Sequence, residues 1–207
     1  MVERLSELPR KVLILLAQGF EAFEAAVFTD VFGWADTVCR LPVRAVTAGL
    51  RSSVDCAWNL RVVPEMLIPD VQPEQYSALV VPGGFGGGGY FEDAFAPEFL
   101  EVIEKFNYFG KPVVGVCVGA LALGRAGILK GRRAVTYHRE GGMWRSQLAS
   151  MGACVVDEPV VCDGNVITCT SPAAAAESAF MLLETLVGRE GRLLVEVQMG
   201  FRSAVTD

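Results

Sequence analysis

The chain has 207 residues, of which 52% are apolar and 20% are charged, and its formal net charge at pH 7 is −6. This length and apolar content predict one domain with a large core, and no apolar run is long enough to span a bilayer. Because the basic residues are scattered and the net charge is negative, a nucleic-acid partner is not expected.

The amino terminus, MVERLSELPRK, lacks the apolar segment of a signal peptide, so we expect a cytoplasmic protein. No two cysteines are spaced C-x-x-C, and reduced thiols are expected in that compartment. They are Cys39, Cys56, Cys117, Cys154, Cys162 and Cys169. The only histidine is His138, so a zinc site would lack its usual ligands, and we expect no metal.

The first predicted elements are a buried strand at residues 11–16, KVLILL, and a helix at residues 20–37. Apolar residues at helical spacing are expected to pack this helix on the sheet; they are Phe20, Phe23, Val27, Val31 and Trp34. Glu24 interrupts this stripe and should face the sheet, whereas Glu21 should be more exposed.

Two more strands are predicted at residues 43–48 and 77–82, with a turn-rich segment and a short extended piece at residues 60–63 between them. The strand at residues 77–82 leads into Gly83-Gly84-Phe85-Gly86-Gly87-Gly88-Gly89, whose six glycines indicate a close approach to another part of the backbone. A phosphate-binding loop is disfavoured because no Gly-Lys-Ser/Thr sequence follows. The alternative is a flexible surface loop.

Pro97 is expected to begin a helix that ends near Gly110 and packs through Phe99, Val102, Ile103 and Phe106. The stretch PVVGVCVGALALGRAG, residues 112–127, then indicates a buried strand that turns sharply into a helix.

Within this stretch, Cys117 has a glycine two residues away on either side, which is the spacing of a nucleophile elbow. Side chains at Gly115 and Gly119 would clash where the strand turns. Cys117 would lie at a helix amino terminus that favours a thiolate, so we expect it to be the most acidic of the six thiols. The alternative is that Cys117 packs as a small apolar residue.

The last third of the chain predicts a short strand at residues 134–137, a helix at residues 143–151 and a hairpin around Asp163-Gly164. A final helix, residues 173–187, is expected to be capped by Thr170 or Ser171 and to stop at Gly188. Pro172 lies near its first position.

Strands that alternate with helices predict an α/β fold with a doubly wound, mostly parallel sheet covered by helices on both faces. Ligands bind such sheets beyond the carboxyl ends of the strands. Glu24, the glycine loop and Cys117 each follow a strand, so we expect them to converge on one edge.

These motifs resemble the ThiJ/PfpI superfamily, whose members are flavodoxin-like, over residues 11 to about 189. The resemblance puts Glu24 on the acid that contacts the nucleophile, and it matches Val81-Pro82-Gly83-Gly84 to the loop that supplies oxyanion-hole amides. It matches Cys117-Val118-Gly119 to the elbow and Thr170-Ser171-Pro172 to the final loop and helix. It also implies a homodimer, with a tail at residues 1–10, one domain at residues 11–198 and a second tail at residues 199–207.

The chain departs from this pattern at Tyr137, where the deglycase branch of the family has histidine, and His138 is the next residue. Adjacent side chains on a strand face opposite ways, and unshifted register selects Tyr137 as the inward one; a one-residue shift would select His138. Val118 replaces the histidine of the peptidase branch and the threonine typical of the isonitrile-hydratase branch, which disfavours both activities.

The resemblance implies cofactor-independent hydration of small reactive carbonyls such as methylglyoxal or glyoxal. Cys117 would be the nucleophile, the Gly84 and Val118 amides would hold the oxyanion, and Glu24 would move a proton. Gly83 and Glu21 would line the substrate site. The alternatives are a redox sensor or chaperone-like stress protein that uses an oxidisable Cys117, and a binding module without chemistry.

Overall fold

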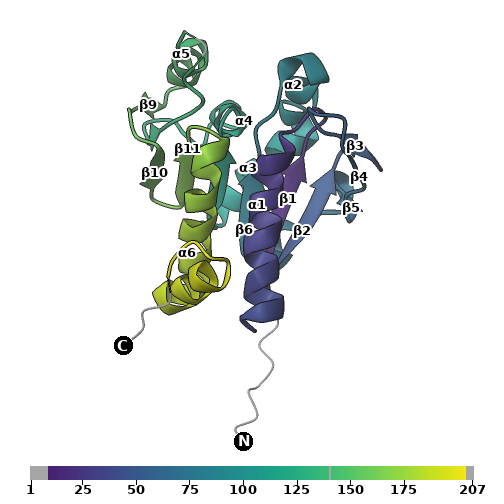
Figure 1. Cartoon of the computed structure of the whole chain (residues 1–207). Coiled ribbons are helices and arrows are strands. Elements are labelled where there is room, and N and C mark those ends of the chain that lie inside the picture. Colours follow the sequence, from purple (N-terminus) through teal and green to yellow (C-terminus); the bar gives the residue numbers. More distant parts are fainter. Residues whose placement is uncertain (1–8, 140, 204–207) are drawn as a thin grey trace, which may run out of the picture.

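The centre of the molecule is a seven-stranded sheet, seen in a computed structural model that describes residues 9–139 and 141–203 (Figure 1). The strand order is β10-β11-β7-β6-β1-β2-β5, and within the sheet only β10 is antiparallel to its neighbour. The strands are β1 (Arg10–Leu16), β2 (Val43–Gly49), β5 (Met66–Leu67), β6 (Ala78–Val81), β7 (Val113–Val116), β10 (Val160–Asp163) and β11 (Val166–Cys169). The predicted doubly wound, mostly parallel, flavodoxin-like α/β fold is confirmed.

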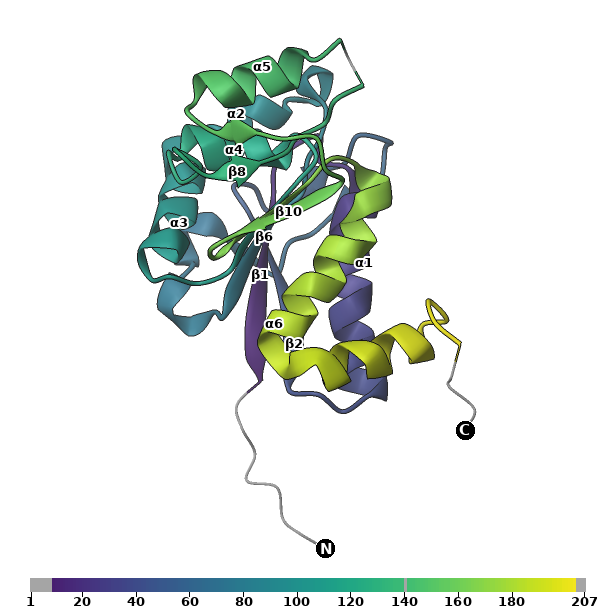
Figure 2. The ribbon, with the colours of Figure 1, turned by 90° about the vertical axis from the view of Figure 1, so that its left-hand side faces the viewer.

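Helices cover both faces of the sheet (Figures 1 and 2). α1 (Ala22–Gly33) and α6 (Pro172–Gln198) pack on one face, and α3 (Pro97–Tyr108) and α4 (Gly119–Arg125) pack on the other. The remaining elements are α2 (Tyr90–Ala94), α5 (Met143–Ser150), the π-helix η1 (Trp34–Val38), the 3-10 helices η2 (Ile68–Asp70), η3 (Pro73–Gln75) and η4 (Gly86–Gly88), and the strand pairs β3 (Val54–Asp55) with β4 (Arg61–Val62) and β8 (Arg133–Ala134) with β9 (Cys154–Val155). No helix in the described ranges is both long and apolar enough to cross a membrane.

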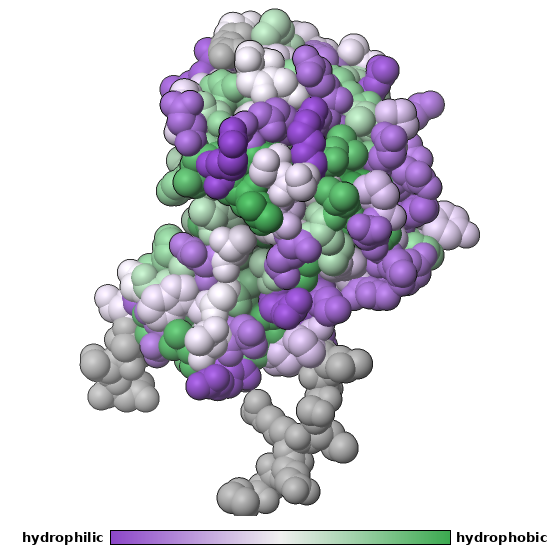
Figure 3. Space-filling model, turned by 90° about the vertical axis from the view of Figure 1, so that its right-hand side faces the viewer, coloured by the Kyte–Doolittle hydropathy of each residue, from purple (hydrophilic) through white to green (hydrophobic). Residues whose placement is uncertain are grey.

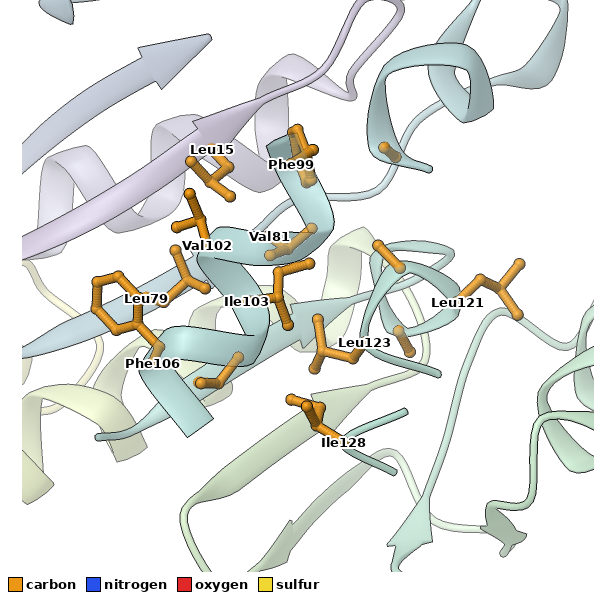
Figure 4. Packing of buried hydrophobic residues seen from close by; sticks show 14 of the residues in the cluster. Leu15, Leu79, Val81, Phe99, Val102, Ile103, Phe106, Leu121, Leu123 and Ile128 are labelled. Carbon is orange, nitrogen blue, oxygen red and sulfur yellow. The ribbon is translucent and has the colours of Figure 1, made fainter. Parts of the chain in front are cut away.

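Alternate residues of the central strands pack into the two helix layers. Leu13 and Leu15 of β1 belong to the layer of α3, whereas Val12 and Ile14 belong to the layer of α1 and α6. Figure 4 shows the α3 layer, where the helix lies against the strands and against α4. The apolar stripe predicted for α3 is fully or almost fully buried at Phe99, Val102, Ile103 and Phe106.

The stripe predicted for the first helix is partly wrong. Phe20 is buried but precedes the helix, and the buried apolar residues of α1 are Ala25, Phe28, Val31 and Phe32. Phe23 is 57% exposed and Trp34 is 38% exposed. Phe23 lies five residues before Phe28, which at 3.6 residues per turn places it on the far side of the helix.

The strand predicted at residues 134–137 extends no further than Ala134, and residues 135–139 form a loop. The partner strand β9 has only two residues, so the ladder ends there. Beyond it the Val135 amide donates to Thr168 Oγ1 at 3.0 Å, which ties this loop to β11.

The final helix begins at Pro172 after Ser171, as predicted, but Ser171 makes no side-chain capping hydrogen bond. It bends at Gly188 (φ 81°, ψ 169°) instead of ending, and it continues to Gln198 (Figure 2). Arg192, after the bend, contacts Glu177 and Glu184 before it, which holds the two segments together. Of the predicted tails, residues 1–8 and 204–207 lie outside the described residues. Arg10 already belongs to β1. Residues 199–203 follow the end of α6.

Candidate active site

Three neighbouring strands of the sheet, β1, β6 and β7, carry the predicted site elements at their carboxyl ends. The chain passes from β1 to β2 on one side and returns to β6 on the other, so the strand order reverses between β1 and β6. Such a reversal opens a crevice at the carboxyl edge of a parallel sheet, because the connections leave in opposite directions. Glu24, Gly84 and Cys117 all line one cavity there.

Cys117 lies on a sharp turn between β7 and α4, with a backbone φ of 54°. A Cβ on Gly119 would overlap Val81 O of the adjacent strand, and a Cβ on Gly115 would come within 3.0 Å of Ala120 Cα. The Cys117 amide donates to Cys169 O at 2.9 Å, and Thr136 Oγ1 donates to Cys117 O at 2.9 Å. The two glycines therefore permit a close-packed elbow that neighbouring segments hold in place.

Glu24 is fully buried beside this turn, and its Oε2 accepts a hydrogen bond from the Gly83 amide at 2.7 Å. Burial raises the pKa of Glu24 from 4.5 to about 7, against the opposing effects of the Gly83 amide and Cys117, while the charge of Glu21 raises it further. Oε1 has no hydrogen-bond partner of good geometry among the described residues, although the Cys117 thiol lies close enough to affect the acid. Glu24 can therefore exchange a proton near neutral pH.

Cys117 was predicted to be an acidic thiol, but its surroundings raise its pKa. Burial raises the pKa of Cys117, and a Glu24 carboxylate raises it further, while only the Val118 amide acts strongly in the opposite direction. α4, whose amino terminus the prediction relied on, has only seven residues. The thiolate of Cys117 therefore becomes favourable mainly when Glu24 holds the proton, so the two groups titrate as a pair.

The glycine loop after β6 approaches other backbone closely, as predicted. A Cβ on Gly84 would overlap the backbone carbonyl of Gly19 as well as the Tyr90 ring. Tyr90 Oη donates to Pro82 O at 2.6 Å. The Gly83 amide donates to Glu24 and thereby helps to position the acid. Within the described ranges, neither the Gly84 nor the Val118 amide donates to a backbone carbonyl, and both residues line the cavity.

Tyr137 lines the same cavity, and His138 is not among the residues that line it. Both belong to the loop after β8, so the strand alternation used to separate them does not apply. Their ring centroids are 6.4 Å apart, and the buried Nδ1 of His138 has no hydrogen-bond partner in the described part of the chain. Of these two adjacent residues, the one that lines the cavity with Cys117 is therefore the tyrosine.

The cavity has a volume of about 440 Å³ and is walled by Glu21, Phe85, Trp144 and Pro172 in addition to the groups above. Glu21 accepts hydrogen bonds from Trp58 Nε1, at 3.1 Å to Oε1 and 3.0 Å to Oε2. The sequence reasoning missed the roles of Trp58, Phe85 and Trp144. Phe85 carried a signal, since it is the one side chain inside the glycine loop.

The described residues contain no group of three or more histidine, cysteine, aspartate or glutamate side chains that could hold a metal ion. The groups available for chemistry in the cavity are a thiol, the carboxyl groups of Glu21 and Glu24, backbone amides and a phenol. Together they can add a nucleophile to an electrophile and move a proton.

This combination of a parallel α/β sheet and a buried acid beside a cysteine on a nucleophile elbow defines a class of cysteine-centred α/β proteins. Residues 10–185 match the model of the DJ-1/PfpI family, and the chain belongs to that family.

Several relatives of this chain illustrate the variety of proteins in the family. The chain is 30% identical over 189 residues to Protein DJ-1 homolog B of Arabidopsis thaliana, covering 90% of this chain but only 40% of that protein. It is 31% identical to Isonitrile hydratase of Pseudomonas putida over 90% of this chain and 78% of the other. It is 29% identical to Glutathione-independent glyoxalase DJR-1.2 of Caenorhabditis elegans over 81% and 86%. The crystal structure of Drosophila melanogaster DJ-1beta superposes with a TM-score of 0.81 at 25% identity, covering 93% of this chain and 98% of that one.

Proposed function

We propose that this protein is a cysteine-dependent, cofactor-independent enzyme that adds water to small reactive dicarbonyls such as methylglyoxal and glyoxal. The observation that supports this most is the pairing of Cys117 with a fully buried Glu24 whose pKa is about 7. A relative in Caenorhabditis elegans carries the name of a glutathione-independent glyoxalase, which is consistent with this class of reaction.

In the proposed reaction, the Cys117 sulfur adds to the aldehyde carbon and the thiol proton passes to Glu24. The carbonyl oxygen becomes an oxyanion that the Gly84 and Val118 amides hold, because donors fixed in advance stabilise charge as it develops. Glu24 gives the thiol proton to this oxyanion and becomes a carboxylate again. It then takes the hydrogen of the former aldehyde carbon as a proton and delivers it to the carbon of the neighbouring carbonyl, while the hydroxyl proton moves to that carbonyl's oxygen. Water releases the resulting thioester as a 2-hydroxy acid and restores the thiol.

Tyr137 would act in this site as a hydrogen-bond donor that orients the substrate, since a phenol donates well and is a weak base at neutral pH. Glu21 would bound the substrate site on the side of Trp58. His138 has no assigned step, because it does not line the cavity.

The test is dicarbonyl turnover without glutathione, in wild type and in Cys117→Ala and Glu24→Gln. We expect no turnover in Cys117→Ala and a loss of about two or more orders of magnitude in Glu24→Gln, as when a nucleophile or a proton-transfer group is removed. In wild type, kcat/KM should rise with pH around 7, because the reactive pair holds one proton and the pKa of Glu24 is about 7.

The matched control is His138→Ala, which should keep nearly full turnover. Full activity of pure Cys117→Ala would contradict covalent catalysis at this residue. A large loss in His138→Ala, with Tyr137→Phe unaffected, would show that the histidine takes part in catalysis. Absence of any dicarbonyl turnover, together with selective peroxide oxidation of Cys117, would instead support a redox sensor.

We also propose that the chain forms a homodimer through an apolar face on α1 and the β3–β4 hairpin. Phe23 is 57% exposed and Leu60 is 55% exposed, and both line an apolar groove of about 400 Å³ together with Phe20 and Val62. Exposed apolar patches of this kind mark interaction surfaces. Figure 3 shows apolar side chains at the surface on one side of the molecule, among polar ones.

We place this activity in the cytoplasm, where reactive dicarbonyls arise and thiols stay reduced. All six cysteines lie in the described ranges, and each is a free thiol.

A further inference from the structure

The cavity beside Cys117 has a negative electrostatic character. Glu21 and Glu24 both line it, and no lysine or arginine does so among the described residues. Glu21 is 9% exposed, with both carboxyl oxygens directed at Trp58 Nε1. An anionic ligand would meet like charge in a partly enclosed space, where water and salt screen charges weakly.

The walls of the same cavity are aromatic. Phe85, Tyr137 and Trp144 line it. Trp144 packs against Phe91 with ring centroids 5.3 Å apart, and Phe85 packs edge-on against Trp58 at 4.9 Å. Aromatic faces attract flat apolar groups and, through their quadrupoles, cations. Phe85 and Trp144 are therefore in contact with neighbouring rings in the absence of a ligand.

The cavity is also larger than a three-carbon dicarbonyl requires. Its volume of about 440 Å³ equals that of roughly fifteen water molecules at ~30 Å³ each. Methylglyoxal would fill a small part of it. The remaining space, bounded by rings, suits a flat substituent attached to the reacting carbonyl.

We propose that this cavity selects aromatic carbonyl compounds that are neutral or cationic and rejects anionic ones, with Glu21 setting the charge preference and Trp144 holding the ring. This inference rests on the proposed function, since the carbonyl is what Cys117 attacks. It adds a substrate class that the reacting groups alone do not define.

The first test measures binding without chemistry, with three inert aromatic ligands that differ in charge: benzyltrimethylammonium, benzyl alcohol and benzoate. Titration of tryptophan fluorescence or calorimetry gives the affinities. We expect wild type to bind the cation about tenfold or more tighter than the anion, the size of effect that one nearby carboxylate and an aromatic wall produce. The ratio should shrink as salt is added. Benzoate binding as tightly as the cation would overturn the proposal.

Variants then separate the two roles. Glu21→Gln should reduce the cation-to-anion ratio about tenfold and leave benzyl alcohol binding nearly unchanged. Trp144→Ala should weaken all three ligands, the cation most because it also loses the ring face, and should lower the ratio less than Glu21→Gln does. Trp34→Ala, on the surface at η1, is the matched control and should change neither the three affinities nor their ratio. If Glu21→Gln leaves the ratio unchanged, Glu21 does not set it. If this variant fails to fold, the wild-type ratio and its salt dependence still decide the proposal.

The second test compares kcat/KM, obtained from initial rates, for phenylglyoxal, methylglyoxal and 4-carboxyphenylglyoxal. We expect phenylglyoxal to be the best substrate and the carboxylated compound to be about tenfold or more worse than phenylglyoxal. If no dicarbonyl is turned over but the ligand order holds, the proposed function fails and the pocket selectivity stands. If methylglyoxal is turned over and the ligand order is reversed, only the selectivity fails.

Discussion

The backbone of Cys117, with φ at 54°, lies in a region where only glycine is unstrained. A left-handed conformation costs a residue with a Cβ about 1–2 kcal/mol. We therefore expect the Cys117→Gly protein to be about 1 kcal/mol more stable than the Cys117→Ala protein, although glycine at most positions gives a less stable protein than alanine does. Urea denaturation of the two variants measures this. Equal stability would mean that the elbow relaxes when the sulfur is removed.

Glu24 makes stability depend on pH in an unusual direction. Its folded-state pKa of about 7 lies above the ordinary value of 4.5, so the folded chain binds this proton more tightly than the unfolded chain. Stability attributable to Glu24 is therefore lost as pH rises from 4.5 through 7, and the difference between these values corresponds to ~3 kcal/mol.

Glu24→Gln removes this dependence. The difference in free energy of unfolding between Glu24→Gln and wild type should rise by ~3 kcal/mol between pH 4.5 and pH 8, in favour of the variant. Denaturation at a series of pH values measures it. Glu104→Gln, at an exposed position of α3, is the matched control and should show no such rise. A flat difference for Glu24→Gln would contradict a buried acid at this position.

At the residue scale, the sequence predicted the acid and the thiol better than it predicted their surroundings. Glu24 could be placed toward the sheet because helical spacing puts it on the face of Phe28. The thiol pKa could not be predicted, because it depends on burial and on a carboxyl group more than 90 residues away in the sequence. Trp144, which lines the cavity, and Trp58, which contacts its lining residues Glu21 and Phe85, were missed for a similar reason, since nothing local in the sequence shows that these distant rings meet at the site.

At the scale of the elements, the turn between β7 and α4 leaves little room for added atoms. A Cβ on Gly119 would overlap the carbonyl of Val81, which belongs to β6 and cannot move without disturbing the sheet. We expect Gly119→Ala to destabilise the fold by about 1–3 kcal/mol, the range for overpacking, and to lower turnover by displacing Cys117.

Gly33→Ala supplies the matched control for that change. Gly33 ends α1 with helical backbone angles, and nothing lies within 4 Å of its added Cβ. Alanine there should be neutral or stabilise by up to about 1 kcal/mol. Thermal denaturation of both variants compares them directly. A Gly119→Ala protein as stable as Gly33→Ala would show that the elbow is not tightly packed.

Helices and strands were predicted correctly where the apolar pattern of a segment and the turn residues at its ends indicate the same element. The hairpin of β10 and β11 forms around Asp163-Gly164 as predicted, because two β-branched runs flank a turn signal. Residues 134–137 were predicted as a strand because AVTY is apolar, but the strand ends at Ala134 because no partner strand extends beside the residues that follow. The bend at Gly188 was taken for an end, since a glycine with positive φ stops a helix locally whether or not another helix follows.

At the scale of the whole molecule, the exposed face of α1 predicts the assembly state. One chain has a mass of 22.3 kDa, and sedimentation should give about twice that value for wild type. Phe23→Glu should shift the mass to that of a monomer, because a buried unpaired charge is costly in an apolar interface. Tyr108→Glu, which alters an equally prominent exposed aromatic residue on α3, should leave the mass unchanged. A monomeric wild type would contradict the dimer.

The two edge strands of the central sheet, β5 and β10, are short. β5 has two residues and β10 has four, so each border presents few unpaired amides and carbonyls. Long, flat edge strands are templates onto which a strand of another molecule can add, and short ones protect against fibrillar aggregation. Crowded copies of this chain are thereby directed away from strand exchange and toward contacts between folded surfaces.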